Sequence, residues 1–268
     1  MPQALVVGPF ALQVNVLLAL LALWGGWFAA ARIGAARGVD VSNQLWLLLA
    51  AGLAAARLGF AWQYRDAYLA APLSILDVRD GGWAPWPGVA AASLVALWGA
   101  LRRRTLALPL AAAVAGSAAL WIAGSLALDR LQDAPDLPDV SVVGLDGTRV
   151  SLQQWKGQPV VLNLWATWCP PCVREMPVLQ QAQAAHPGVH FVFLNRGEAP
   201  QKVSAFVARH RLEARNVFLD PTGAAATLLG GRALPTTLFF DRDGRLVDTR
   251  VGELSRATLA QRLEGLAR

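Results

Sequence analysis

The sequence predicts two domains of different classes: an all-α domain of about four transmembrane helices, then an α/β domain with a central mixed sheet flanked by helices. The first prediction rests on apolar residues that crowd the first 130 positions of a chain with 55% hydrophobic and 16% charged residues. The second rests on a Cys-x-x-Cys motif that lies between an apolar run typical of a buried strand and a segment of helical composition. We place the domains at 1–134 and 135–268, with a short Asp- and Pro-containing linker at 129–138.

Four apolar segments in the first domain have close to the roughly 20 residues needed to cross a bilayer. No basic stretch precedes the first segment and no convincing cleavage site follows it, so we expect a retained anchor rather than a cleaved signal peptide. Prolines and a glycine crowd the start of the third segment. The segments span residues 10–31, 45–64, 83–101 and 106–128.

The positions of the arginines predict the orientation of these segments, because basic residues concentrate in short cytoplasmic loops. Arg32 and Arg37 lie between the first two segments, and three arginines at 102–104 lie between the third and fourth. Both loops are therefore expected in the cytoplasm, with the N-terminus, the 65–82 loop and the α/β domain outside. This topology also explains the densest basic cluster, so the net charge of +6 does not predict nucleic-acid binding.

Cys169 and Cys172 are the only two cysteines of the chain, and they lie two residues apart. At the first turn of a helix, this spacing leaves one thiol exposed and the other just behind it, so that the pair can open and close as a disulfide. Amide groups at a helix N-terminus stabilise a thiolate, so Cys169 is predicted as the attacking nucleophile and Cys172 as the resolving thiol. Pro170 and Pro171 occupy the first helical positions, where a missing N–H costs little.

Two other roles of the motif are weighed against redox chemistry. Half of a zinc site would need partners among His186, His190 and His210, but the first two flank a Pro-Gly turn. A static disulfide would close so small a loop that it would stabilise little by chain entropy. We therefore expect surface histidines, no metal, and no cofactor beyond the redox-active disulfide itself.

The other elements of the α/β domain follow in a fixed order around this motif. An apolar strand precedes it, a helix follows it, and Pro235 stands at the entrance of a later apolar strand that leads into a hairpin. The ranges are 159–165 for the first strand, 173–185 for the helix, 234–240 and 246–251 for the hairpin strands, and 255–266 for a final amphipathic helix.

This β-α-β, then β-β-α order and the run VVLNLWATWCPPCVREMP at 160–177 resemble the TlpA/ResA-like branch of the thioredoxin superfamily. Similar patterns lie at 140–150, 152–157 and 194–198, so the resemblance covers about 135–268. It implies a membrane-tethered thiol–disulfide oxidoreductase that faces the bacterial periplasm or the cell exterior. It also implies a cis-proline at Pro235 that packs against the cysteine pair. The residues implied to bind the substrate are Trp168, Pro170, Pro171, Leu234, Pro235 and Thr236.

One position separates this branch from cytosolic thioredoxins, which carry a buried aspartate where this chain has Asn163. Asparagine does not titrate, so proton transfer at Cys172 needs another group. The resemblance places an acid at Glu175, three residues after Cys172; the alternative is an ordinary charged residue in the first turn of a helix. The peroxiredoxin pattern fails because Thr167 lies only two residues before Cys169, which disfavours direct peroxide chemistry.

The membrane half, about 7–128, resembles the N-terminal part of prolipoprotein diacylglyceryl transferase, which moves a diacylglyceryl group from phosphatidylglycerol to a lipoprotein cysteine. The similarity lies at 7–10, 52–60, 72–73 and 78–83. That family continues to a His-Gly-Gly signature where this chain has Trp86-Pro87-Gly88, and its later transmembrane segments have no counterpart, so transferase activity is not expected. Arg57 is a charge inside an apolar segment and is expected to pair with Asp66, Asp77 or a lipid phosphate.

Together these patterns predict a bacterial inner-membrane enzyme that reduces selected periplasmic protein disulfides. Cys169 attacks the substrate disulfide, a mixed disulfide forms, and Cys172 resolves it. The membrane half contains no cysteine, so it anchors the domain in lipid or docks a separate membrane electron donor. The alternatives are a disulfide oxidant, a lipid-modifying diacylglyceryl transferase, and a chaperone that holds Cu(I) through both thiolates.

Overall fold

The computed structural model describes residues 4–7, 10–69, 72–131, 136–213, 216–231 and 233–266. They form two compact units: a helical unit of residues 12–131, and a unit of residues 4–7, 10–11 and 136–266 that contains a mixed sheet. The predicted domain boundary, between 134 and 135, lies outside the described residues. Two short strands, β1 (Ala4–Val7) and β2 (Phe10–Gln13), pair before the first helix.

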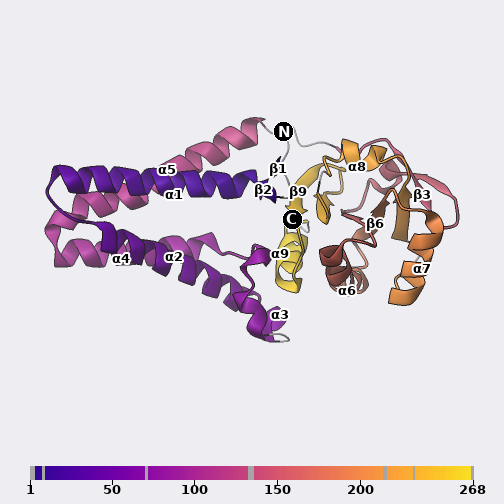
Figure 1. Ribbon diagram of the computed structural model, residues 1–268, viewed down its shortest axis with the longest axis horizontal. Helices are drawn as coiled ribbons and strands as arrows, with labels where there is room; N and C mark the ends of the chain where they lie inside the picture. The colour runs from indigo at the N-terminus through magenta and orange to yellow at the C-terminus, as the bar shows by residue number, and fades with distance from the viewer. Residues whose placement is uncertain are drawn as a thin grey trace. The chain divides into compact units, whose positions relative to one another are not determined.

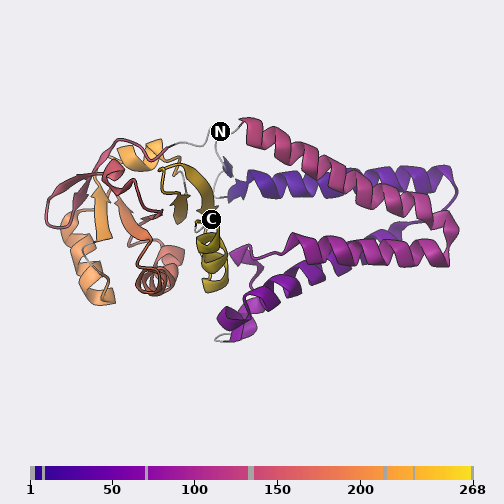
Figure 2. The same cartoon turned by 180° about the vertical axis from the view of Figure 1, so that it is seen from behind.

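The helical unit is built from two antiparallel helix pairs, α1 with α5 and α2 with α4, and a contact between α4 and α5 joins them (Figure 1). The view from behind shows the same pairing (Figure 2). Short helical turns connect α2 to α4 and α4 to α5. The bounds are α1 Val14–Ala36, α2 Ser42–Gln63, α3 Arg65–Leu69, η1 Pro72–Leu76, η2 Val78–Asp80, α4 Pro85–Arg102, η3 Arg104–Leu106 and α5 Ala107–Leu131.

Three stretches of this unit are long and apolar enough to cross a membrane: α1, α2 and Arg104–Leu128. The all-α prediction is confirmed, but the third predicted span, 83–101, which forms α4, does not reach the same apolar content, because its 18 helical residues begin with two prolines and end with an arginine. The first predicted span also starts too early. Residues 10–13 form β2, and the helix begins at Val14.

Glycine allows the helices of a pair to approach closely. A Cβ atom on Gly88 of α4 would lie 2.9 Å from the carbonyl oxygen of Gly52 and 3.0 Å from the Cβ atom of Ala56, both in α2. A larger residue at 88 would therefore push the helices apart, as expected for small-residue contacts between membrane helices.

The two arginine-bearing loops lie at the same end of the helical unit. Val39 and Val41, which follow α1, share an apolar cluster with Leu106 and Leu110 at the start of α5. The loop after α1 and the connection from α4 to α5 are therefore neighbours. The arginines of this end, all exposed, are Arg32, Arg37, Arg102, Arg103 and Arg104.

The second unit contains a seven-stranded mixed sheet in the order β4-β3-β7-β6-β5-β8-β9. Strands β5, β6 and β7 run parallel, and every other neighbouring pair is antiparallel. The strands are β3 Ser141–Gly144, β4 Arg149–Ser151, β5 Val160–Trp165, β6 His190–Arg196, β7 Val217–Asp220, β8 Thr236–Phe240 and β9 Leu246–Val251. The helices are η4 Leu152–Trp155, α6 Pro170–Ala185, α7 Pro200–His210, α8 Ala224–Leu228 and α9 Arg256–Leu266.

Alternate residues of the central strands build a hydrophobic core on each face of the sheet. Val161 and Trp165 of β5 join the cluster formed with α6, α7 and α9, whereas Leu162 and Leu164 join the cluster formed with η4 and α8. Figure 1 shows α8 on the opposite side of the sheet from α6 and α7. The predicted mixed sheet flanked by helices is confirmed, and burial on both faces explains why β5 is a continuous apolar run.

Candidate active site

The cysteine pair lies where the central strand β5 passes into α6. Three residues, 166–168, connect the strand to Cys169, which caps the N-terminus of α6. The helix begins at Pro170, so both prolines occupy its first turn, as predicted. Cys169 and Cys172 form a disulfide with Cα atoms 5.3 Å apart, and the backbone N–H of Cys172 donates to Sγ of Cys169 over 3.3 Å.

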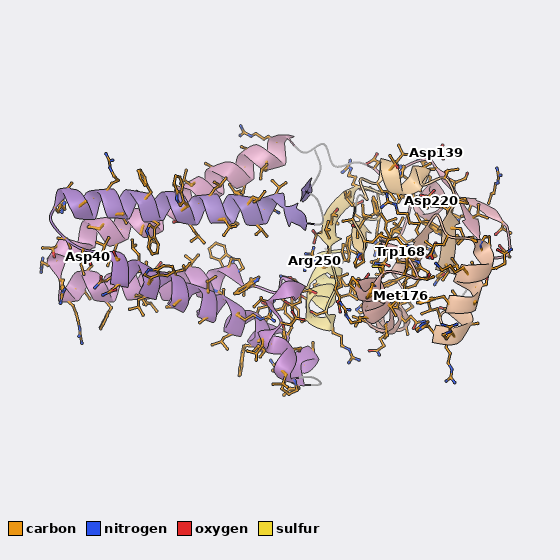
Figure 3. All side chains as sticks on the ribbon, in the orientation of Figure 1. Asp40, Asp139, Trp168, Met176, Asp220 and Arg250 are labelled. Atoms are coloured by element: carbon orange, nitrogen blue, oxygen red, sulfur yellow. A yellow bond between two sulfur atoms is a disulfide. The ribbon has the colours of Figure 1, made fainter. Side chains whose placement is uncertain are left out.

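Cys169 is less accessible than predicted. Its residue is only 3% exposed and Cys172 is fully buried, because the disulfide turns Sγ of Cys169 inward onto the first turn of α6. The adjacent Trp168 is 64% exposed, and Met176 lies inside on α6 (Figure 3). The site therefore presents an exposed indole beside a nearly enclosed disulfide.

Glu175 is fully buried on α6 and hydrogen-bonded at both carboxylate oxygens. The side-chain amide of Asn163 donates to Oε1 over 2.7 Å, and the backbone N–H of Leu254 donates to Oε2 over 3.0 Å. Glu175 follows Cys172 by three residues, a spacing that places two side chains on the same face of a helix. The predicted acid thus lies behind the disulfide and away from solvent.

Burial raises the pKa of Glu175 to about 8, although the hydrogen bonds from Asn163 and Leu254 act in the opposite direction. The negative charge of Glu253 adds to the increase in this pKa, and the positive charge of Arg250 opposes it. A carboxyl group with this pKa can hold or release a proton near neutral pH. This is the property that the nontitrating Asn163 lacks.

Asn163 connects Glu175 to the strand that follows Pro235. Its Nδ2 group also donates to Oγ1 of Thr237 over 3.0 Å, and Thr237 pairs with Asn163 in the β5–β8 register. Its Oδ1 atom is buried without a hydrogen-bond partner. The proton-bearing side chain is therefore held by a residue of the central strand.

The Leu234–Pro235 peptide bond is cis, as the resemblance implied. The Pro235 carbonyl accepts a hydrogen bond of 2.9 Å from the N–H of Gly252, and Leu234 packs against the cluster that contains both cysteines. Thr236 is buried, and its hydroxyl donates to the carbonyl of Ala233 over 2.7 Å. Among the other residues predicted to bind substrate, Pro170 is exposed and Pro171 half-buried.

The sequence analysis gave no role to Glu198, although the 194–198 motif contains it. Its carboxylate accepts hydrogen bonds from the backbone N–H and the hydroxyl of Thr167, each 2.6 Å long. The amide of Asn195 donates to it over 2.9 Å, and Lys202 forms an ion pair of 2.6 Å. The only signal in the sequence was the motif itself, because the chain separates Thr167 from Glu198 by 31 residues.

Two expectations about other polar residues are wrong. Arg57 forms an ion pair with Asp80, at 2.9 Å between Nη1 and Oδ1, and donates to the backbone carbonyl of Asp77 over 3.1 Å. Arg57 also donates to three further backbone carbonyls, those of Ser74, Ile75 and Gly82.

His190 was expected at the surface. It is instead half-buried and stacks on Trp155 at 4.8 Å between ring centroids, and burial lowers its pKa.

Comparison with known proteins agrees with both halves of this description. Residues 132–263 match the redoxin family model, and residues 2–130 match the model of prolipoprotein diacylglyceryl transferase. Thiol-disulfide oxidoreductase ResA of Bacillus thuringiensis subsp. konkukian is 30% identical over 51% of this chain and 79% of its own length. Thioredoxin-like protein YneN of Bacillus subtilis is 32% identical over 50% of this chain and 80% of its own length.

A solved structure of MTB DsbF is 30% identical to this chain, with a TM-score of 0.47 over 50% of this chain and 98% of that one. Both predicted resemblances are confirmed by the family models and the curated relatives. The chain belongs to the ResA-like thiol–disulfide oxidoreductases of the redoxin family, and it carries a prolipoprotein diacylglyceryl transferase-like domain before the redoxin domain.

Proposed function

We propose that this protein is anchored in the bacterial inner membrane and reduces protein disulfides on the periplasmic side. The observation that carries the proposal is a disulfide at the N-terminus of α6 with a buried, hydrogen-bonded carboxyl group three residues behind it. In the reduced enzyme, the thiolate of Cys169 attacks one sulfur of the substrate disulfide and the other sulfur leaves as a thiolate. Cys172 then attacks the mixed disulfide and releases the reduced substrate.

Glu175 serves the second step by accepting the proton that Cys172 loses when it becomes a nucleophile. A carboxyl group with a pKa near 8 is matched to this task at neutral pH. Exposed Trp168 and Pro170, with half-buried Pro171 and Leu234, form the surface that meets the substrate backbone, and the buried Pro235 and Thr236 continue the chain from Leu234. Each turnover converts the dithiol to the Cys169–Cys172 disulfide, so a separate membrane donor must return two electrons.

The helical unit supports the proposed orientation. Five exposed arginines gather at one of its ends, where Val41 packs with Leu106, and such clusters favour the cytoplasmic side. Arg102 lies over the ring of Trp98 at 4.5 Å, a pairing suited to a membrane–water interface. The Arg57–Asp80 pair lies at the opposite end of α2 and α4, on the proposed periplasmic side.

The direction of electron flow is tested by the reduction potential of the full-length protein in detergent. The redox state of the two cysteines is trapped with a thiol reagent in dithiothreitol or glutathione buffers. A potential near or below about −250 mV is expected for a reductase. A potential near about −120 mV would instead assign the protein to disulfide formation.

The orientation is tested by labelling in intact cells whose outer membrane has been made permeable. After reduction, Cys169 should react with a membrane-impermeant maleimide without lysis of the inner membrane. The matched control is an Arg103→Cys variant of a chain in which Cys169 and Cys172 are both serine, and it should react only after lysis. The reverse pattern would place the redox unit in the cytoplasm.

A further inference from the structure

The turn between β6 and α7 is shaped around the side chain of Glu198. Gly197 has a φ of +72°, which reverses the chain after Asn195. The Asn195 side chain then binds Glu198 twice: Oδ1 accepts from the Glu198 backbone N–H over 3.3 Å, and Nδ2 donates to Oε2 over 2.9 Å. Asn195 is fully buried and lies opposite Trp165, the last residue of β5, so the rigid sheet fixes the position of the carboxylate.

The carboxylate of Glu198 is nearly enclosed, with 6% of its side chain exposed. Burial works to raise its pKa, but hydrogen bonds from Asn195, Lys202 and Thr167 outweigh burial and hold the pKa at about 2. Glu198 is therefore ionised at physiological pH. Hydrogen bonds to an ionised acceptor are shorter and stronger than neutral ones, which agrees with the two 2.6 Å contacts to Thr167.

Thr167 is the middle residue of the three that connect β5 to the nucleophile. The carboxylate of Glu198 accepts hydrogen bonds from both donors of Thr167, the backbone N–H and the hydroxyl. A hydrogen bond of 3.3 Å from the N–H of Cys169 to the carbonyl of Ala166 closes the turn that contains Thr167 and Trp168. From this turn Trp168 projects into solvent with 64% of its surface exposed.

We propose that Glu198 is a positioning residue that holds the Thr167–Trp168 segment, so that Trp168 and Cys169 meet an incoming protein disulfide in a preset arrangement. Glu198 acts through Thr167 and does not touch the sulfur atoms. It affects the bimolecular attack on a bulky disulfide, where orientation matters, and leaves the intrinsic reactivity of the thiolate unchanged. This inference rests on the proposed reductase function and adds to it the part of the chain that orients the substrate-facing residues.

The test compares two reactions of the reduced full-length protein in detergent. The first is the second-order reaction with a synthetic peptide closed by one disulfide, and the second is alkylation of Cys169 by iodoacetamide. For Glu198→Gln, which keeps the shape and removes the charge, we expect the peptide reaction to fall about tenfold or more, as for the loss of one charge-assisted hydrogen bond. Alkylation should not be slower than in the wild type.

Variants of Thr167 test the same contact if Glu198→Gln folds poorly. Thr167→Val removes only the hydroxyl donor and should slow the peptide reaction. Thr167→Ser keeps that donor, so its peptide reaction should be as fast as that of the wild type. The effects of Thr167→Val and Glu198→Gln should be less than additive in the double variant. Glu264→Gln, the same substitution at an exposed position of α9, is the matched control and should behave as the wild type.

The outcomes separate the inference from the function on which it rests. If the reduced wild type leaves the peptide disulfide intact, the reductase function fails and the inference fails with it. If the wild type reacts and Glu198→Gln reacts equally fast, only the positioning role is overturned. A parallel loss of peptide reaction and alkylation would also overturn it, because that pattern reports a general loss of structure.

Discussion

The side-chain amide of Asn163 donates a hydrogen bond of 2.7 Å to the carboxylate of Glu175, and the two residues belong to the central strand and to the helix that carries the cysteines. Cytosolic thioredoxins place their titrating group on the strand. Here the strand supplies a hydrogen-bond donor and the helix supplies the titrating carboxyl group.

The buried Glu175 predicts an unusual dependence of stability on pH. Its pKa in the folded state, about 8, lies above its ordinary value of 4.5, so the folded protein binds more protons than the unfolded chain between these pH values. The stability that this group contributes is therefore present at acid pH and is lost as the pH rises toward and through 8, by an amount on the order of a few kcal/mol. Thermal melts of the full chain at pH 5 to 9 should show this decline for the wild type, and a flatter profile for Glu175→Gln. An equal decline in both proteins would assign the pH dependence to another group.

A second acid beside Glu175 should be poorly tolerated. In Asn163→Asp two carboxyl groups would lie within hydrogen-bonding distance in a buried site, so they would share one proton and the second ionisation would be strongly opposed. We expect the variant to resemble the wild type near pH 5 and, by pH 8, to lose roughly 2 kcal/mol or more of stability beyond the loss in the wild type. Melts at the two pH values, with the exposed Gln181→Glu on the same helix as control, measure the effect. A variant whose stability declines between the two pH values no more than that of the wild type would contradict it.

The two cysteines should behave differently when only one remains. In Cys172→Ser the mixed disulfide formed through Cys169 cannot be resolved, so a covalent complex with the peptide substrate should accumulate on a nonreducing gel. In Cys169→Ser the remaining thiol belongs to a fully buried residue, and little complex is expected. Accumulation with Cys169→Ser instead would reverse the assignment of nucleophile and resolving thiol.

The Arg57–Asp80 pair should hold the segment that joins α2 to α4. Besides the ion pair, the guanidinium donates to the backbone carbonyls of Ile75 and Gly82, so one side chain binds that segment at several separate points. Removing one partner of a buried pair costs about 3–5 kcal/mol. For Asp80→Asn we expect faster hydrogen exchange and proteolysis within residues 72–84, and for the exposed Arg65→Gln no change. Unchanged protection in Asp80→Asn would show that the segment is held by other contacts.

The sequence by itself determined the redox motif, the strand and helix on either side of it, and the order of the later elements. These follow from local patterns: an apolar run buried on both faces, prolines in a first helical turn, and a hairpin turn before β9. The acid at Glu175 could also be named before the structure was known, because the resemblance to the TlpA/ResA-like branch places an acid three residues after Cys172. The span starting at Phe10 was extended too far, since hydropathy does not distinguish a short apolar strand from the start of a helix.

The tertiary structure alone decided which distant polar residues meet. Glu198 and Thr167 come together because β5 and β6 are parallel neighbours whose following loops leave the same edge of the sheet. Arg57 meets Asp80 rather than the predicted Asp66 or Asp77, because the turns of η1 and η2 bring Asp80 back to α2. The tertiary structure also decided the low exposure of Cys169, because its Sγ atom turns inward and accepts a hydrogen bond from the N–H of Cys172 at the start of α6. Such contacts depend on strand register and on the path of a turn, which no local sequence pattern encodes.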